Sequence, residues 1–118
     1  KILNATYRSA DIFVASSVQD AWPKTFAEAM LCGTPTICFD NTSISEIVDH
    51  KINGYIVKKF DAKYLAKGIT WLAKETKYNA KIRQNCQNKI LKYDSNLIAK
   101  KYYHLYQKLL YKNYKNKY

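Results

Sequence analysis

Glycine and proline are scarce in this sequence, which has three Gly and two Pro among 118 residues. That composition excludes collagen-like and low-complexity chains, and a hydrophobic content of 47% excludes a disordered one. Long apolar runs are also missing: none approaches the ~18 residues of a membrane-spanning helix, and the first residues lack the apolar stretch of a secretion signal. We therefore expect a soluble, cytoplasmic segment with a packed core, long enough for one small domain.

Paired cysteines and recognisable metal motifs are missing as well. Cys32, Cys38 and Cys86 are odd in number and form no C-x-x-C pair, so neither a disulfide framework nor a zinc site is indicated. His50 and His104 have no ligand partner at i+4. No P-loop and no G-x-G-x-x-G occurs. We expect reduced, structural cysteines, no metal and no bound cofactor.

Arginine is rare although the chain is basic. The formal net charge is +11, but 18 of the 20 basic residues are Lys, and Arg is the side chain that reads phosphate and guanine bidentately. Residues 1–57 carry four basic and six acidic side chains, whereas residues 58–118 carry 16 and three. Such asymmetry separates a chemical part from an interaction surface. The chemistry is expected in the first half, and nucleic acid is not expected as a partner.

The first half of the chain alternates between strand and helix patterns. Short apolar, β-branched runs predict strands at residues 11–15, 34–39 and 55–57. Apolar side chains at helical spacing predict a helix over 23–32, and residues 45–49 predict a shorter one. Gly33 is placed to end the first of these helices in a left-handed cap, and Asn53-Gly54 to turn into the third strand. This order predicts βαβ units with parallel strands.

The second half reads as three helices. Asp61 is expected to cap the first, a second covers 79–92, and Asp94-Ser95 caps a third that runs toward the C-terminus. The expected apolar face of the first comprises Ala62, Leu65, Ala66, Ile69, Leu72 and Ala73.

The last helix has an apolar stripe beside a basic flank. The stripe consists of Ile98, Tyr102, Leu105, Tyr106 and Leu109, and the flank of Lys101, Lys108, Lys112 and Lys115. Two interpretations stay open. An anionic membrane surface attracts such a helix, and a helix that packs on its own domain with solvated lysines has the same pattern.

The densest group of chemically active residues lies between Ser16 and Pro35. It combines a loop at the carboxyl end of a predicted parallel strand with a helix N-terminus, the usual place for phosphate-bearing ligands in such sheets. Asp20 lies in the loop and Glu28 in the helix, eight positions later. The two acids could contact separate hydroxyl groups of an extended ligand. They could equally be a capping residue and a solvated helix residue.

The order of these residues resembles a known family. Asp20-x7-Glu28, followed by Ala-Met-Leu-Cys-Gly-Thr-Pro at 29–35, is similar to the Glu-x7-Glu signature of retaining glycosyltransferases of family 4, which have the GT-B fold. The flanking segments 7–17 and 45–57 resemble the same family, and the likeness spans about residues 5–75. The Asp-x-Trp-Pro-x-Thr form is similar to a subgroup that makes bacterial capsule and lipopolysaccharide glycans.

The resemblance implies a role for each motif residue. Asp20 takes the place of the acid that binds donor-sugar hydroxyls and serves catalysis, with a side chain one methylene shorter than Glu. Glu28 takes the place of the acid that binds the nucleotide ribose diol. The backbone amides implied to meet the sugar and the diphosphate are those of Ala21, Trp22, Lys24 and Thr25. Lys24 is the basic residue nearest the motif, and its side chain could reach a phosphate or lie in solvent. The loop 40–43 lacks the Gly-Gly that family members often carry, which leaves its ligand contact in doubt.

The resemblance also implies what kind of molecule the chain comes from. It predicts an α/β fold: the C-terminal half of a Rossmann-like donor-binding domain, with three of six strands in residues 1–60 and a helical, basic segment in residues 61–118. The whole protein would be a hexosyltransferase that moves a sugar, with retention, from a nucleotide-diphosphate-sugar to a bacterial surface glycan or a lipid-linked acceptor. We expect a cytoplasmic protein, and the inner face of the bacterial membrane stays open as an alternative site for it.

Several expectations concern what this segment does without the rest. The acceptor-binding N-terminal domain and the basic residues that neutralise the diphosphate lie upstream in the family, so the segment alone should be inactive. An open strand edge or apolar face predicts self-association. Two alternatives remain: a GT-B-fold nucleotide-sugar epimerase, and a non-catalytic Lys-rich module that binds nucleic acid or anionic membrane.

Overall fold

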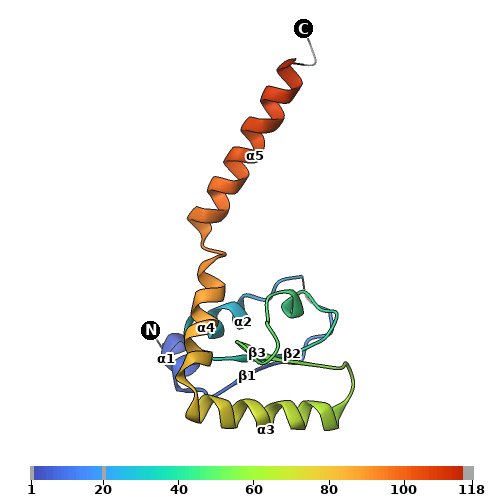
Figure 1. Ribbon diagram of the computed structural model, residues 1–118, viewed down its shortest axis with the longest axis vertical. Helices are drawn as coiled ribbons and strands as arrows, with labels where there is room; N and C mark the ends of the chain where they lie inside the picture. The colour runs from blue at the N-terminus through green and yellow to red at the C-terminus, as the bar shows by residue number, and fades with distance from the viewer. Residues whose placement is uncertain (1, 20, 116–118) are drawn as a thin grey trace.

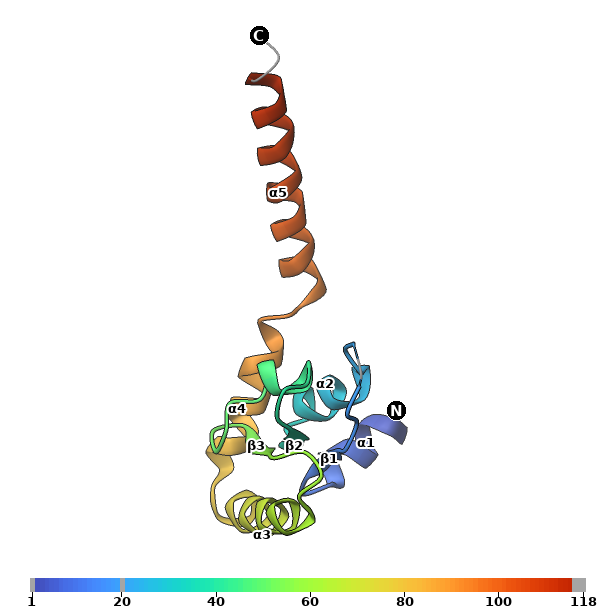
Figure 2. The same ribbon diagram turned by 90° about the vertical axis from the view of Figure 1, so that its right-hand side faces the viewer.

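A three-stranded parallel sheet organises the molecule. The computed structural model describes residues 2–19 and 21–115 of the chain. Its strands are β1 (Phe13–Ala15), β2 (Thr36–Phe39) and β3 (Gly54–Val57), in the order β1-β2-β3 with β2 at the centre. Helices cover both faces of this sheet (Figures 1 and 2). The predicted α/β fold with three parallel strands and flanking helices is confirmed.

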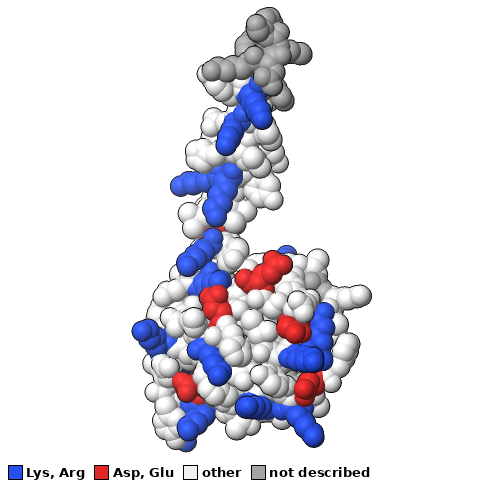
Figure 3. All heavy atoms as spheres, turned by 45° about the vertical axis from the view of Figure 1, so that its right-hand side comes forward, with Lys and Arg blue, Asp and Glu red and all other residues white. Residues whose placement is uncertain are grey.

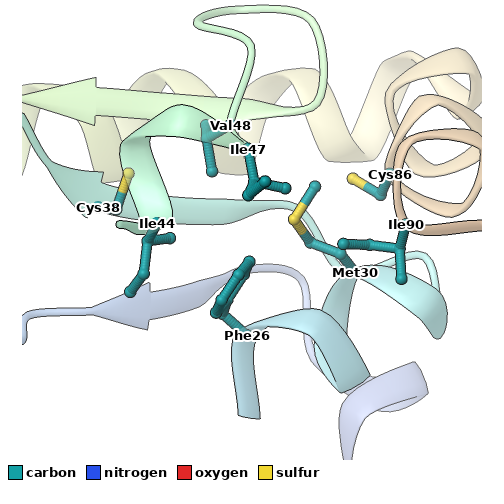
Figure 4. Close-up of a cluster of buried hydrophobic side chains, with 8 residues drawn as sticks. All are labelled: Phe26, Met30, Cys38, Ile44, Ile47, Val48, Cys86 and Ile90. Carbon is teal, nitrogen blue, oxygen red and sulfur yellow. The ribbon is translucent and has the colours of Figure 1, made fainter. Parts of the chain in front are cut away.

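One face of the sheet is covered by α2 (Lys24–Leu31) and α4 (Ala80–Leu91), with the short 3₁₀ helix η1 (Ile44–Glu46) beside them. Their apolar side chains point toward one another and form a single buried cluster (Figure 4), made of Phe26, Met30, Cys38, Ile44, Ile47, Val48, Cys86 and Ile90. Burial of each large apolar side chain contributes about 1.5–3 kcal/mol. This cluster fixes α2, the helix that carries the motif, to the sheet.

The opposite face is covered by α3 (Ala62–Tyr78). The second buried cluster lies there and contains Ile37, Phe39, Tyr55, Val57, Leu72 and Ile82. Ile37 and Phe39 of β2 face α3, whereas Cys38 between them faces α2. That alternation is the period of two expected for a strand that is buried on both faces.

The cap of α2 follows the sequence pattern closely. Gly33 adopts φ +84°, its N–H donates to the Met30 carbonyl, and the Thr34 N–H donates to the Ala29 carbonyl. These two bonds make a Schellman motif, which requires a left-handed residue where Gly33 stands. The helix begins one residue later than predicted, because Pro23 occupies the capping position in an extended conformation, with φ −69° and ψ 124°.

Gly54 has a different role from the one predicted. The left-handed residue of this turn is Lys51, with φ 63°, and Gly54 is the first residue of β3. A Cβ atom at Gly54 would lie 2.2 Å from the Thr36 carbonyl oxygen. Glycine is therefore needed for the close approach of β3 to β2, not for the turn.

The predicted apolar face of α3 is partly wrong. Asp61 does cap this helix, since its Oδ1 accepts a hydrogen bond from the Tyr64 N–H at 2.9 Å. However, Ala62, Ala66 and Ala73 are exposed, and the fully buried residues are Gly68, Leu72 and Thr76. Gly68 faces the core because the bulky ring of Tyr55 packs against it, and a Cβ atom at this position would lie 2.8 Å from Tyr55 Cδ1.

The chain ends in a long helix, α5 (Ser95–Lys115), that leaves the body of the molecule. Asp94 Oδ1 accepts from the Asn96 N–H at 2.9 Å and so caps it as predicted. Figures 1 and 2 show α5 projecting away from the sheet and its other helices, and its described side chains are exposed or half-buried. Within the part of the chain that the structure describes, no helix is both long enough and apolar enough to cross a membrane.

Candidate donor-binding site

The candidate site begins in the loop from β1 to α2. Ala21 and Trp22 lie in this exposed loop, and Lys24 and Thr25 form the first turn of α2. The structure thus places these four predicted residues together, at the carboxyl end of β1. Asp20, the predicted catalytic residue, lies outside the residues that the structure describes.

The side chain of Trp22 ties this loop to the helices. Its ring lies 5.4 Å from the ring of Phe26 in α2 and 5.5 Å from that of Tyr93, which follows α4. Aromatic pairs at such separations stabilise by about 0.5–1.5 kcal/mol beyond their buried area. The indole therefore holds the loop in place, which leaves the Trp22 backbone as the part suited to a ligand.

The N-terminus of α2 offers backbone donors. Pro23 occupies its capping position, makes no side-chain hydrogen bond to the first turn and has no N–H of its own. The first N–H groups of a helix have no partner within it, and together with the helix dipole they attract anions. Lys24 and Thr25 provide these N–H groups.

Glu28 is exposed, but a buried residue holds its carboxylate. The Tyr7 hydroxyl donates to Glu28 Oε2 at 3.3 Å, although the two residues are 21 positions apart. Tyr7 is only 8% exposed and belongs to α1 (Ile2–Ser9). Burial, and then the neighbouring negative charge of Glu28, raise the pKa of the Tyr7 hydroxyl. The hydroxyl therefore keeps its proton and remains a donor to the carboxylate.

Tyr7 is itself anchored from two sides. Thr34, just after the cap of α2, donates its hydroxyl to the Tyr7 carbonyl, and the Tyr7 ring contacts Phe13 of β1 edge-on at 6.1 Å. Sequence reasoning missed this residue, because nothing in the spacing of the motif points 21 positions upstream. The sequence around Tyr7 indicates only a helix that ends before a strand.

Glu28 and Lys24 share a small cavity beside α2. It has a volume of about 230 Å³ and is also lined by Trp22, Ala27 and Ile90. A carboxylate and an ammonium group therefore lie one helical turn apart at one hollow. This volume is below the ~300–1,000 Å³ of typical ligand pockets. The residues form part of a binding surface rather than a closed site.

The loop after β2 lies at the same end of the sheet as the β1–α2 loop. Asn41 adopts φ 52°, a left-handed conformation that asparagine tolerates better than most residues. Thr42 and Ser45 exchange hydrogen bonds of 2.7–3.3 Å, and the Lys59 N–H donates to Asp40 Oδ1 at 3.2 Å. The loop thus has an internally bonded, left-handed turn without the Gly-Gly pair.

Comparison with solved structures shows the class of protein that this fold defines. A sucrose-phosphate synthase from Thermosynechococcus elongatus superposes with a TM-score of 0.80 over 92% of this chain and 28% of its own, at 24% identity. The Anabaena protein HepE, solved in complex with UDP, superposes with a TM-score of 0.64 over 72% of this chain and 24% of its own, at 26% identity. The fold is that of GT-B glycosyltransferases.

Sequence comparison shows the family. The model for glycosyl transferases group 1 matches residues 2–89, so the chain belongs to that family. A relative from Campylobacter jejuni, N,N'-diacetylbacillosaminyl-diphospho-undecaprenol alpha-1,3-N-acetylgalactosaminyltransferase, is 29% identical over 87% of this chain. An uncharacterised glycosyltransferase from Methanocaldococcus jannaschii is 28% identical over 89%. The chain spans 27% of the length of each of these two relatives.

Proposed function

We propose that this chain forms the donor-binding part of a retaining family 4 glycosyltransferase, which transfers a hexosyl group from a nucleotide-diphosphate-sugar to a bacterial surface glycan. Membership of the glycosyl transferases group 1 family carries this proposal, together with the placement of Glu28 one helical turn after Lys24 at the start of α2. The HepE structures with UDP and with UDP-glucose support a nucleotide-sugar donor.

Each site residue has a defined part in the proposed donor complex. Glu28 accepts hydrogen bonds from the ribose diol, with its carboxylate oriented by Tyr7. The backbone N–H groups of Lys24 and Thr25 at the N-terminus of α2 bind the diphosphate, and those of Ala21 and Trp22 meet the sugar. Asp20 binds sugar hydroxyls. Stabilisation of the leaving diphosphate by fixed donors is the main electrostatic requirement of such a transfer, and we propose that no metal takes part.

Transfer requires a second domain. An acceptor must be aligned with the donor, and positioning of the two reactants accounts for a large share of enzymatic rate enhancement. We therefore propose that these 118 residues alone bind donor weakly and transfer nothing. Transferase relatives favour this activity over an epimerase or a non-catalytic Lys-rich module. If the protein instead binds any polyanion in a salt-sensitive way and does not select nucleotides, that result would favour the non-catalytic Lys-rich module.

The stereochemistry of the product tests the proposed reaction. The full-length enzyme should give a product whose anomeric configuration matches that of the donor sugar, seen in the first turnovers by proton NMR. Inversion at the anomeric carbon would exclude a retaining mechanism. Release of an epimerised sugar without transfer would favour the epimerase.

A second proposal concerns α5, whose apolar stripe is exposed to solvent. Leu105 and Leu109 are each 49% exposed, and the helical spacing places Lys101, Lys108 and Lys112 along one flank of this stripe. Figure 3 shows basic side chains along the projecting helix. Residues 95–115 contain no acidic side chain. A helix with an apolar face and a basic face binds at an anionic membrane surface. The Campylobacter jejuni relative is named for a diphospho-undecaprenol substrate, so we propose a lipid-linked acceptor at the cytoplasmic face of the membrane.

Vesicle sedimentation tests this membrane contact. Intact protein should bind vesicles that contain anionic lipid, and replacement of Lys101, Lys108 and Lys112 by Glu should abolish the binding. The matched control replaces Lys58, Lys63 and Lys77, which are exposed lysines on the body of the molecule, and should bind as the unmodified protein does. Failure of the intact protein to bind anionic vesicles would exclude the proposal.

A further inference from the structure

A second cavity lies beyond β3, at the opposite edge of the sheet from β1. Its volume is about 550 Å³, within the ~300–1,000 Å³ of small-molecule pockets. Its lining combines basic and aromatic side chains from the β3 region and α3, among them His50, Lys51, Tyr55, Lys67, Trp71 and Lys74. None of its lining residues also lines the cavity beside Glu28.

The floor of this cavity is a fixed aromatic surface. Tyr55 is only 3% exposed, and its ring lies 4.4 Å from that of His50 and 5.5 Å from that of Trp71. Gly68 of α3 gives the ring its space, since a Cβ atom there would approach Tyr55 Cδ1 to 2.8 Å. Trp71 is half-buried, so part of its ring system faces the cavity. A planar or ring-shaped group that stacks on Trp71 would take the place of the Lys51 ammonium group that lies over this ring.

The rim of the cavity is positively charged. Lys51, Lys67 and Lys74 are exposed there, and no carboxylate is among the residues that line it. Two of these ammonium groups lie over aromatic rings: Lys51 Nζ is 5.8 Å from the Trp71 centroid, and Lys67 Nζ is 5.9 Å from that of Tyr64. Lys51 and Lys67 are therefore held beside aromatic rings that line the cavity.

His50 adds a neutral donor to the same cavity. Its Nδ1 accepts a hydrogen bond from the Ile56 N–H at 3.1 Å, so the proton of the neutral ring is on Nε2. Burial and the neighbouring Lys51 lower the pKa of His50, which favours this neutral form. The cavity thus combines hydrogen-bond donors and positive charge with an aromatic surface.

We infer that this cavity binds a small phosphorylated compound whose ring stacks on Trp71 and whose phosphate is held by Lys51, Lys67 and Lys74. A nucleoside monophosphate and a sugar phosphate share this chemistry. Aromatic stacking contributes about 1–3 kcal/mol per base in nucleic-acid sites, and hydrogen bonds to charged groups are stronger than neutral ones. The inference is independent of the donor site, because the two cavities share no lining residue.

Fluorescence of Trp71 tests this inference directly. Trp22→Phe in the 118-residue chain leaves Trp71 as its single tryptophan. We expect saturable changes in its emission with uridine 5′-monophosphate or glucose 6-phosphate at about 0.15 M salt, where weak surface attraction is screened. A response to only one of the two compounds identifies the ring that stacks on Trp71, either a nucleoside base or a sugar. Uridine and glucose without phosphate should bind at least about tenfold more weakly.

Charge-matched variants locate the binding. Replacement of Lys51, Lys67 and Lys74 by Gln should weaken the affinity more than about tenfold, while the same replacement of Lys100, Lys101 and Lys108 in α5 should leave it unchanged. Three results would overturn the inference. The two lysine variants could lose affinity equally, inorganic phosphate could bind as tightly as the phosphorylated compounds, or Glu28→Ala could weaken their binding. If Trp22→Phe does not fold, the indole N–H resonance of Trp71 in the unmodified chain provides the same readout by NMR. The absence of a saturable shift of this resonance would overturn the inference.

Discussion

The carboxylate of Glu28 is oriented by a residue that lies outside the motif. Tyr7 combines a buried ring with a hydroxyl that reaches Glu28, and its backbone is tied to Thr34. Without the hydroxyl, Glu28 would remain exposed and would have to be ordered by the ligand itself. Tyr7 is therefore a positioning residue for the proposed ribose contact.

Tyr7→Phe should weaken nucleotide binding by about 2–10-fold, because it removes one hydrogen bond of about 0.5–1.5 kcal/mol and keeps the ring. The loss should be smaller than that from Glu28→Ala. Isothermal titration with UDP or GDP measures it, and Tyr78→Phe, at a side chain that is 73% exposed, is the matched control. Unchanged affinity in Tyr7→Phe would contradict the positioning role.

Cys38 and Cys86 make stability depend on alkaline pH. Burial raises the pKa of each thiol to about 12, from an ordinary value of 9.0. Above about pH 9 the unfolded chain loses these protons and the native chain keeps them, so the unfolded state binds fewer protons. The free energy of unfolding should therefore be unaffected by them below pH 9 and fall as the pH rises toward about 12.

Urea denaturation over this pH range measures the effect. Cys32→Ser is the control, because Cys32 is only partly buried. The free energy of unfolding of this variant should fall with pH as that of the unmodified chain does. A free energy of unfolding that stays constant from about pH 9 to about pH 12 would contradict the buried, protonated state of the two thiols.

At the scale of elements, the chain has two glycines that are needed for different reasons. Gly33 has a left-handed backbone and enough space for a Cβ atom, since the nearest atom would lie 3.6 Å away, an ordinary van der Waals contact. Gly54 has ordinary dihedrals but no space. Gly33→Ala should cost about 1–2 kcal/mol of stability, and Gly54→Ala about 3 kcal/mol or more, because β3 must move away from β2. Thermal unfolding of the two variants compares them, and equal losses would contradict this distinction.

Local patterns predicted the elements well because their signals are short in range. Residues such as Gly33, Asp61 and Asp94 cap helices through hydrogen bonds between residues two to five positions apart, and all three were identified from the sequence. The roles of Gly54 and Gly68 were not, because each depends on one group far along the chain, the Thr36 carbonyl or the Tyr55 ring.

The candidate site shows the same division between local and distant signals. The spacing of Asp20 and Glu28, read with its flanks, indicated a glycosyltransferase, and the comparisons show the glycosyl transferases group 1 family. The structure brings Glu28, Lys24 and Trp22 to one cavity. The hydrogen bond from Tyr7 and the packing of Trp22 on Tyr93 arise from tertiary contacts and could not be predicted.

At the scale of the whole molecule, the sheet has an open edge at β1. The Phe13 N–H donates to the Pro35 carbonyl beside β2 at 2.9 Å, so the Val14 N–H points to the other side. Among the described residues no strand pairs there. Such an edge can pair with another chain, and we expect the 118-residue chain to self-associate.

Val14→Pro should block that association and keep the fold, because proline removes the outward N–H and leaves the pairing of β1 with β2. Sedimentation velocity over a range of concentrations measures the change, with circular dichroism as the check on folding. Association that persists in folded Val14→Pro would place the contact elsewhere, for example on the apolar stripe of α5.

The central proposal is that this chain binds a nucleotide-sugar donor through Glu28, and nucleotide titration of the full-length protein tests it most directly. UDP or GDP should bind saturably, and Glu28→Ala should reduce the affinity by about tenfold or more, since a charged acceptor of the ribose diol is lost. Glu75→Ala, at an acid on α3, should bind as the unmodified protein does. Equal affinity in Glu28→Ala and Glu75→Ala would contradict the account.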